Sequence, residues 1–186
     1  MPLADALGRL AARKKVVWQL QPELLLQPNV PQPMHGVAPR VVLGTKWWDA
    51  ERKRAYASTA YHCQACGVWK FDALGRRWLE GHEVYRIDYC HGRMYYLRTA
   101  PLCHYCHNYI HSGRLLALLE SGKITHAKYT AIIQHGDEVI KRDGLKFPKP
   151  YEGEIAVWSK WRLVVNGKEY PPLYKSQKAW ERAFNK

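Results

Sequence analysis

Apolar residues recur at helical spacing in several parts of the chain. The clearest case is residues 46–57, where Trp47 and Trp48 would face inward while the basic residues of the segment face water. Thr125 is a good helix cap and precedes another stretch of this kind. The spacing predicts helices over residues 3–15, 46–57, 107–120 and 125–142.

Other parts of the chain carry strand and turn signals. Residues 77–87 and 94–98 are rich in aromatic and β-branched residues, which favour extended structure, and polar turn residues separate them. Asn166-Gly167 lies between two apolar runs, a pattern typical of a type I′ hairpin. Ser176 can cap a short terminal helix. Helices and hairpins together predict an α+β protein.

Prolines dominate the segment between the first two predicted helices. Because proline fixes its backbone and has no amide hydrogen, we expect an extended arm or linker there, and not a core element. The prolines are Pro22, Pro28, Pro31, Pro33 and Pro39. The chain then divides into a basic N-terminal segment with the Pro-rich arm (1–45), a central unit (46–122) and a helical and hairpin C-terminal extension (123–186).

Composition is that of an ordinary folded protein. Of 186 residues, 47% are hydrophobic and 24% are charged. No apolar run approaches the roughly 20 residues needed to cross a bilayer, and Met1 to Lys15 lacks the pattern of a signal peptide. We therefore expect a cytoplasmic protein without a membrane partner. In that reducing compartment, five cysteines indicate metal binding more than disulfides.

The charge is strongly unbalanced. Lys and Arg number 29 and Asp and Glu 16, which gives a net charge of +13. Such an excess on a small chain favours a polyanionic partner, most often nucleic acid. The alternative is a basic but inert surface. Eight Trp and twelve Tyr add side chains that can build a core or stack on bases.

Four cysteines form two Cys-x-x-Cys pairs. Cys63 and Cys66 precede the predicted hairpin, and Cys103 and Cys106 follow it. Two such knuckles brought together make a tetrahedral sulfur site that suits structural zinc. A redox motif would need only one pair, and four unrelated buried cysteines would not share this spacing. Cys90 lies alone in the turn and is interpreted as a bystander.

Three histidines lie between and just after the cysteines. His107 and His111 are four residues apart on a predicted helix, so they share one face. His82 lies on the first strand of the hairpin and can face that helix if zinc clamps the two together. The three imidazoles could then hold a divalent cation. Glu80 could orient a ligating histidine, and Glu83 is a candidate general base or ligand.

The alternative for any single histidine is an ordinary surface or core role. We place four of the remaining histidines in that class: His35, His62, His126 and His135.

These residues resemble the HNH endonucleases, a family with the ββα-metal fold. The resemblance covers about residues 46–119 and rests on three segments: "WWDAERKRAYASTAYHCQACG", "LEGHEVYRID" and "LCHYCHNYIHSGRL". It implies that residues 46–122 are a nuclease core and that the protein hydrolyses DNA, double-stranded DNA above all. It also implies one catalytic divalent cation (Mg²⁺, Mn²⁺, Ni²⁺ or Zn²⁺). A phage or mobile-element setting, and thus the host cytoplasm, is implied as well.

The family usually has an adjacent pair on the first strand, a metal ligand followed by a histidine base. Here the pair is His82-Glu83. In one register, His82, His107 and His111 hold the metal and Glu83 stands at the base position; this register keeps three ligands. A shift by one residue makes His82 the base. A middle Asn of the family is missing, and Asn108 lies on the helix instead.

Four arginines flank these residues and could hold neighbouring phosphates, namely Arg86, Arg93, Arg98 and Arg114. A plain surface role is the alternative for each of them. Two other functions fit the same residues. One is a zinc module that binds DNA or RNA but has lost, or nearly lost, the chemistry. The other is an adaptor or inhibitor that binds another protein.

Overall fold

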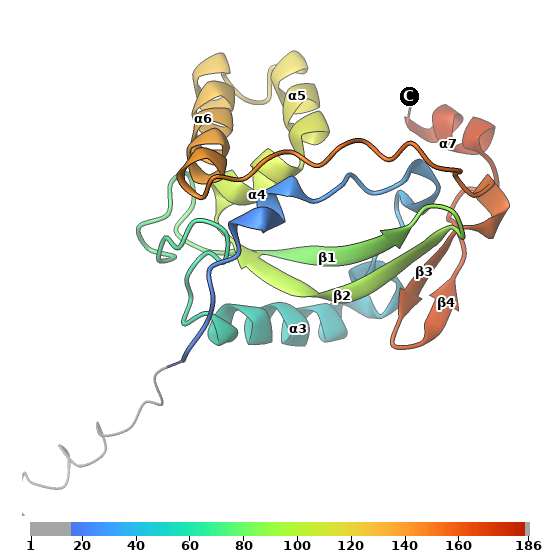
Figure 1. Cartoon of the computed structure of the whole chain (residues 1–186), viewed down its shortest axis with the longest axis horizontal. Coiled ribbons are helices and arrows are strands. Elements are labelled where there is room, and N and C mark those ends of the chain that lie inside the picture. The colour runs from blue at the N-terminus through green and yellow to red at the C-terminus, as the bar shows by residue number, and fades with distance from the viewer. Residues whose placement is uncertain (1–15, 185–186) are drawn as a thin grey trace, which may run out of the picture.

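A mixed sheet of four strands runs through the centre of the protein (Figure 1). The computed structural model describes residues 16–184. The order of the strands is β1-β2-β3-β4, and only the β2–β3 pair is parallel. A bulge between Val84 and Tyr85 interrupts the long first hairpin. The strands are β1 (Glu80–Asp88), β2 (Arg93–Leu102), β3 (Arg162–Val165) and β4 (Lys168–Tyr170).

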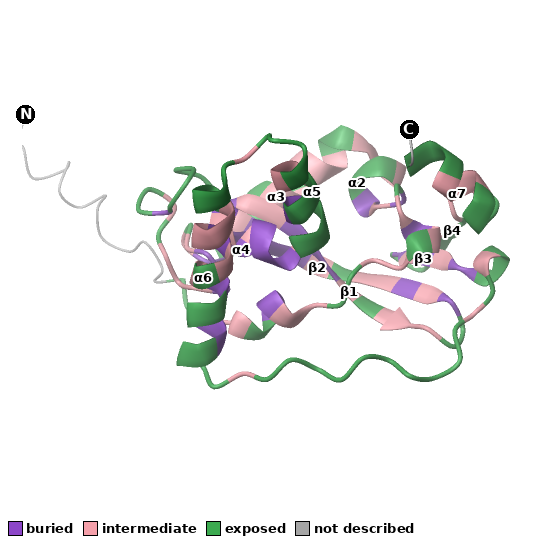
Figure 2. Ribbon diagram, turned by 90° about the horizontal axis from the view of Figure 1, so that it is seen from above, coloured by how far each residue is buried: buried purple, intermediate pink, exposed green. Residues whose placement is uncertain are grey.

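Helices cover both faces of this sheet. One long helix, α3, lies below β1 and β2 in Figure 1, and α4, α5 and α6 lie above them. Helix α4 is largely buried, whereas the outer surfaces of α5 and α6 are exposed (Figure 2). The α-helices of the described chain are α2 (Pro39–Val42), α3 (Gly44–Ser58), α4 (His104–Ile110), α5 (Ser112–Glu120), α6 (His126–Arg142) and α7 (Gln177–Phe184). The predicted α+β class is therefore confirmed.

The Pro-rich segment is part of the core, so the prediction of an arm outside it was wrong. Its prolines shape two short 3-10 helices, η2 (Pro22–Leu26) and η3 (Gln32–Met34), and the apolar residues beside them turn inward. Leu24 and Leu25 are each only 4% exposed and pack with the cysteines and α4. Met34 belongs to a second cluster around β3. Proline restricted the backbone here without keeping its neighbours in water.

Several local predictions are confirmed by backbone geometry and hydrogen bonds. The side chain of Thr125 caps α6 by accepting from the Lys128 amide at 3.2 Å. Positive φ angles of 50° and 75° at Asn166 and Gly167 form the turn between β3 and β4. Ser176 accepts from the amide of Ala179 at 3.3 Å, at the start of α7.

Other boundaries differ from the prediction. The returning strand is longer than residues 94–98, since β2 extends to Leu102. The helix predicted over 107–120 is broken at His111, whose φ and ψ of −90° and 46° separate α4 from α5. The helix predicted over 3–15 lies outside the described residues. Among the helices of residues 16–184, none has the length and apolar character needed to cross a bilayer.

Candidate metal centres

The four predicted zinc ligands come together at the start of α4. Each of the four cysteines offers a sulfur atom, and these atoms all lie within 4.8 Å of one another. Cys103 is the N-cap of α4 and accepts from the amide of Cys106 at 3.4 Å. In the other knuckle the amide of Gly67, at a φ of 85°, donates to the carbonyl of Cys63. The cluster is thus built to hold a metal ion such as zinc.

Electrostatics within this cluster favour a metal over four thiols. Hydrogen bonds from Cys103 and Cys106 hold the pKa of Cys66 far below its usual value. The pKa of Cys106 is raised by its sulfur neighbours, because ionisation beside another thiolate is unfavourable. A bound zinc ion would remove this conflict, since it stabilises all four thiolates at once.

A histidine that sequence reasoning left aside also contacts the cluster. The Nε2 of His135 on α6 lies 3.3 Å from the sulfur of Cys106 and 4.0 Å from that of Cys103, so in its protonated state it can donate to them. An N–H donor of this kind would stabilise negative charge on zinc-bound sulfur. Its distance along the sequence from both cysteine pairs explains why no motif pointed to it.

The three predicted histidines form a second group. His82 comes from β1, His107 from α4 and His111 from the break between α4 and α5. Each offers one nitrogen, and the three nitrogens all lie within 4.8 Å of one another. Ring centroids are 4.8 Å apart for His107–His111 and 5.1 Å apart for His82–His111. His107 and His111 thus stay adjacent although the helix is broken at His111.

Hydrogen bonds leave ring nitrogens available in this group. The Nε2 of His82 donates to Oε1 of Gln27 at 3.3 Å. Its Nδ1 is buried and has no hydrogen-bond partner among the described residues. In His107, Nδ1 donates to Glu80 at 2.6 Å, so Nε2 is left. A buried, unpartnered nitrogen is costly unless something binds it, so the group fits a cation.

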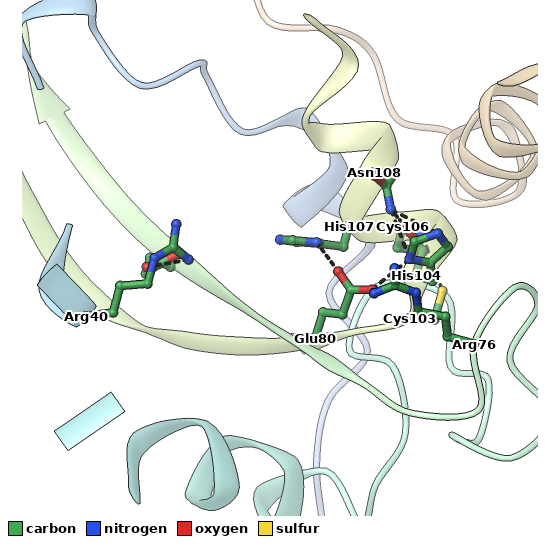
Figure 3. Close-up of polar contacts among 9 residues, drawn as sticks. Arg40, Arg76, Glu80, Cys103, His104, Cys106, His107 and Asn108 are labelled. Carbon is green, nitrogen blue, oxygen red and sulfur yellow. Dashed lines mark hydrogen bonds and ion pairs between the residues drawn. The ribbon is translucent and has the colours of Figure 1, made fainter. Parts of the chain in front are cut away.

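Glu80 ties the cation site to the start of α4. Its two carboxylate oxygens accept from Nδ1 of His104 at 2.7 Å and Nδ1 of His107 at 2.6 Å (Figure 3). Burial is the largest single effect on the pKa of Glu80 and raises it. The hydrogen bonds from the two histidines together outweigh burial and lower that pKa far below its usual value. Arg76 lies 3.4 Å from the same carboxylate. Asn108 contacts His104 and not the three histidines.

Burial keeps two of the three histidines, His82 and His111, neutral. It lowers the pKa of His82 to about 2 and that of His111 to about 4, and the positive charge of His107 acts in the same direction. Both rings are therefore unprotonated at neutral pH. That is the form in which an imidazole binds a metal.

Glu83 lies on the other face of β1. Neighbouring strand residues point to opposite faces, and Gly81, on the Glu83 side, faces α3: a Cβ there would lie 3.0 Å from the ring of Trp48. The Glu83 carboxylate is 3.3 Å from Arg40, and Figure 3 shows Arg40 well away from Glu80. Burial raises the pKa of Glu83. Among the described residues, no hydrogen bond or ion pair joins Glu83 to the three histidines, although the charge of His107 acts on its pKa.

The four arginines predicted to hold phosphates differ in whether other residues already bind them. Arg98 donates to the side chains of Gln21 and Gln64, and Arg93 pairs with Glu169 at 3.0 Å. Arg86 and Arg114 are exposed.

Arg86 stacks on the ring of Tyr95 at 4.0 Å, and the charge of Arg114 helps to lower the pKa of His111. Arg40 adds to the same effect on His111, and Arg40 and Arg98 add to the effect of burial in lowering the pKa of His82.

No family model matches this chain, and neither the curated proteins nor the solved structures contain a significant relative.

Proposed function

We propose that this protein is a metal-dependent endonuclease of the HNH type, which hydrolyses phosphodiester bonds in double-stranded DNA. One observation carries the proposal: His82, His107 and His111 converge on each other, next to but separate from four clustered cysteines. Two antiparallel strands and the following helix supply these residues, which supports a ββα-metal core. Structural zinc would staple the hairpin to α4.

In this proposal the three histidines hold one divalent cation, such as Mg²⁺, Mn²⁺, Ni²⁺ or Zn²⁺. When bound, the cation would polarise the scissile phosphate and lower the pKa of a water molecule. The contribution of the chain is preorganisation. Glu80 orients the ring of His107, and Gln27 holds the ring of His82 through Nε2, which leaves Nδ1 of His82 to hold the cation.

The attacking water must lose a proton, and the groups that could accept it are poorly suited. Among the described residues of the histidine face, Glu80 is already occupied by two histidine N–H groups. His82, with a pKa of about 2, is a poor base at neutral pH and suits the ligand role better. Glu83 is paired with Arg40. We therefore infer slow cleavage, with His82 a ligand.

DNA as the substrate rests on charge. The net charge of +13 gives a strong attraction to phosphates at every encounter. Arg86, Arg114 and the half-exposed Arg40 are the basic side chains best available to hold phosphates near the histidines.

Cleavage of a supercoiled plasmid tests the proposal. Wild-type protein should nick or linearise the plasmid with Mg²⁺, Mn²⁺ or Ni²⁺ and not with a chelator. His107→Ala should abolish this activity and keep the zinc content. His126→Ala, at an exposed histidine on α6, is the matched control and should cleave normally. Equal cleavage by His107→Ala and wild type would refute the proposal.

A second candidate is a DNA-binding zinc protein without cleavage. The pairing of Glu83 with Arg40, which leaves the histidine face without a free base, favours it. Gel-shift assays separate the two: this candidate binds duplex DNA equally well with and without the divalent cation, and the plasmid stays intact in both.

A further inference from the structure

A cavity of about 650 Å³ lies next to the histidine group. Its walls come from five parts of the chain: the end of η2 with the residues after it, the turn after β1, the junction of α4 and α5, α6, and the segment that leads from α6 toward β3. In Figure 1 that last segment is the orange coil that crosses the molecule. A cavity of this volume is ample for one nucleotide.

Shared residues place the cavity beside the cation site. Gln27, which holds the ring of His82, lines the cavity. Ile110 and Ser112, the two neighbours of His111, line it as well. A ligand in the cavity would therefore lie beside Gln27, the partner of His82, and beside both sequence neighbours of His111.

Aromatic rings form much of the wall. Tyr151 stacks on Tyr89 with ring centroids 4.6 Å apart and an interplanar angle of 20°, and it remains 47% exposed. Phe147, 66% exposed, follows on the same segment. An exposed face of a ring that its neighbour already holds flat is a good stacking surface for a base.

Polar groups complete the cavity. Asp137 on α6 accepts from the hydroxyl of Tyr109 at 2.8 Å through Oδ1, which leaves Oδ2 for a ligand. Gly136 makes this arrangement possible, because a Cβ there would lie 2.1 Å from the ring of Tyr109. Lys149 adds a positive charge at the rim. A flat aromatic wall, a carboxylate and a cation suit a nucleotide better than a lipid or an acidic peptide.

We propose that this cavity binds the base of a nucleotide next to the phosphate held at the histidines, with the base turned out of the stack. The inference rests on the proposed function, since it names a subsite for the same substrate. Guanine fits best, because it alone presents two adjacent N–H donors, N1 and N2, which can use the free Oδ2 and the second lone pair of Oδ1 of Asp137. The phosphate would lie toward Lys149 and the cation site.

Titration of the zinc-loaded full chain with 2′-deoxynucleoside 5′-monophosphates tests this inference without cleavage. Amide chemical shifts should move at residues around the cavity, most with dGMP. Deoxyribose 5-phosphate, which lacks a base, should bind at least about ten-fold more weakly, the scale of one lost stacking contact. Tyr151→Ala should weaken dGMP binding by a similar factor, and Asp137→Asn should remove the preference for guanine.

Phe71→Ala is the matched control, since Phe71 is 48% exposed and lies outside the cavity; it should bind dGMP normally. Equal affinity for dGMP and deoxyribose 5-phosphate, or unchanged binding by Tyr151→Ala, would overturn the inference. If the plasmid is cut but dGMP leaves the cavity shifts unmoved, the subsite is wrong and the nuclease stands. If dGMP binds but no cation supports cleavage, the proposed function fails instead.

Discussion

Replacing Glu80 by Gln isolates the support that this carboxylate gives to the proposed cation site. Glu80 accepts from both His104 and His107 and touches no candidate substrate position itself. Gln is nearly the same size and keeps one acceptor oxygen, so the fold should survive. The substitution removes the negative charge behind His107 and one of the two acceptor oxygens.

The size of the effect follows from one hydrogen bond. The His107–Glu80 contact, at 2.6 Å, is charge-assisted, and such bonds contribute about 1.5–3 kcal/mol against roughly half that for neutral ones. Loss of the charge therefore costs about 1–2 kcal/mol, or roughly ten-fold in affinity for the cation. Removal of a partner that orients a metal-ligating histidine typically costs 10–100-fold, and we expect about the lower limit.

Isothermal titration with Mn²⁺, on protein that keeps its zinc, measures this affinity directly. Glu120→Gln, at the exposed end of α5, is the matched control and should bind Mn²⁺ as the wild type does. His104→Ala should change the affinity less than Glu80→Gln, because His104 lies outside the group of three. Unchanged Mn²⁺ affinity in Glu80→Gln would refute the reasoning that His107 is a ligand oriented by this carboxylate.

Cys106→Ser should lose zinc, measured by elemental analysis, and unfold at lower temperature, since zinc binding is coupled to folding; a folded wild type without zinc would contradict this. In cation-free protein, His111 has a pKa of about 4 in the folded chain and 6.5 in the unfolded chain. Between these pH values the unfolded chain binds more protons than the folded one. The free energy of unfolding should therefore rise as the pH rises from about 4 to 6.5. Urea titrations should show less of that rise in His111→Ala. Affinity for duplex DNA should fall steeply with salt, by about 0.9 log units per log unit of salt for each neutralised phosphate; a flat response would favour a protein partner.

Local signals in the sequence were reliable where one residue type has one structural use. Thr125 and Asn166-Gly167 act through their own backbone and side chain, so their roles need no distant partner. The two Cys-x-x-Cys knuckles could be predicted for a similar reason, because this spacing is the one that zinc binding requires. The convergence of the three histidines followed from that frame.

Tertiary contacts explain what the sequence concealed. Proline content suggested an arm, yet Leu24, Leu25 and Gln27 of that segment reach the core and His82. Nothing local marks Gln27 or His135 as partners of the metal ligands, since both contacts depend on how distant segments pack. Which face of β1 carries Glu83 follows only from the pairing of β1 and the packing of α3, and the sequence shows neither.

Crystals of the zinc-loaded protein soaked in Mn²⁺ would test the central claim most directly, by anomalous scattering at two wavelengths. The account predicts one zinc peak among the four cysteine sulfurs and a separate manganese peak bound by His82, His107 and His111. A manganese peak elsewhere, or a zinc site completed by one of these three histidines, would contradict it.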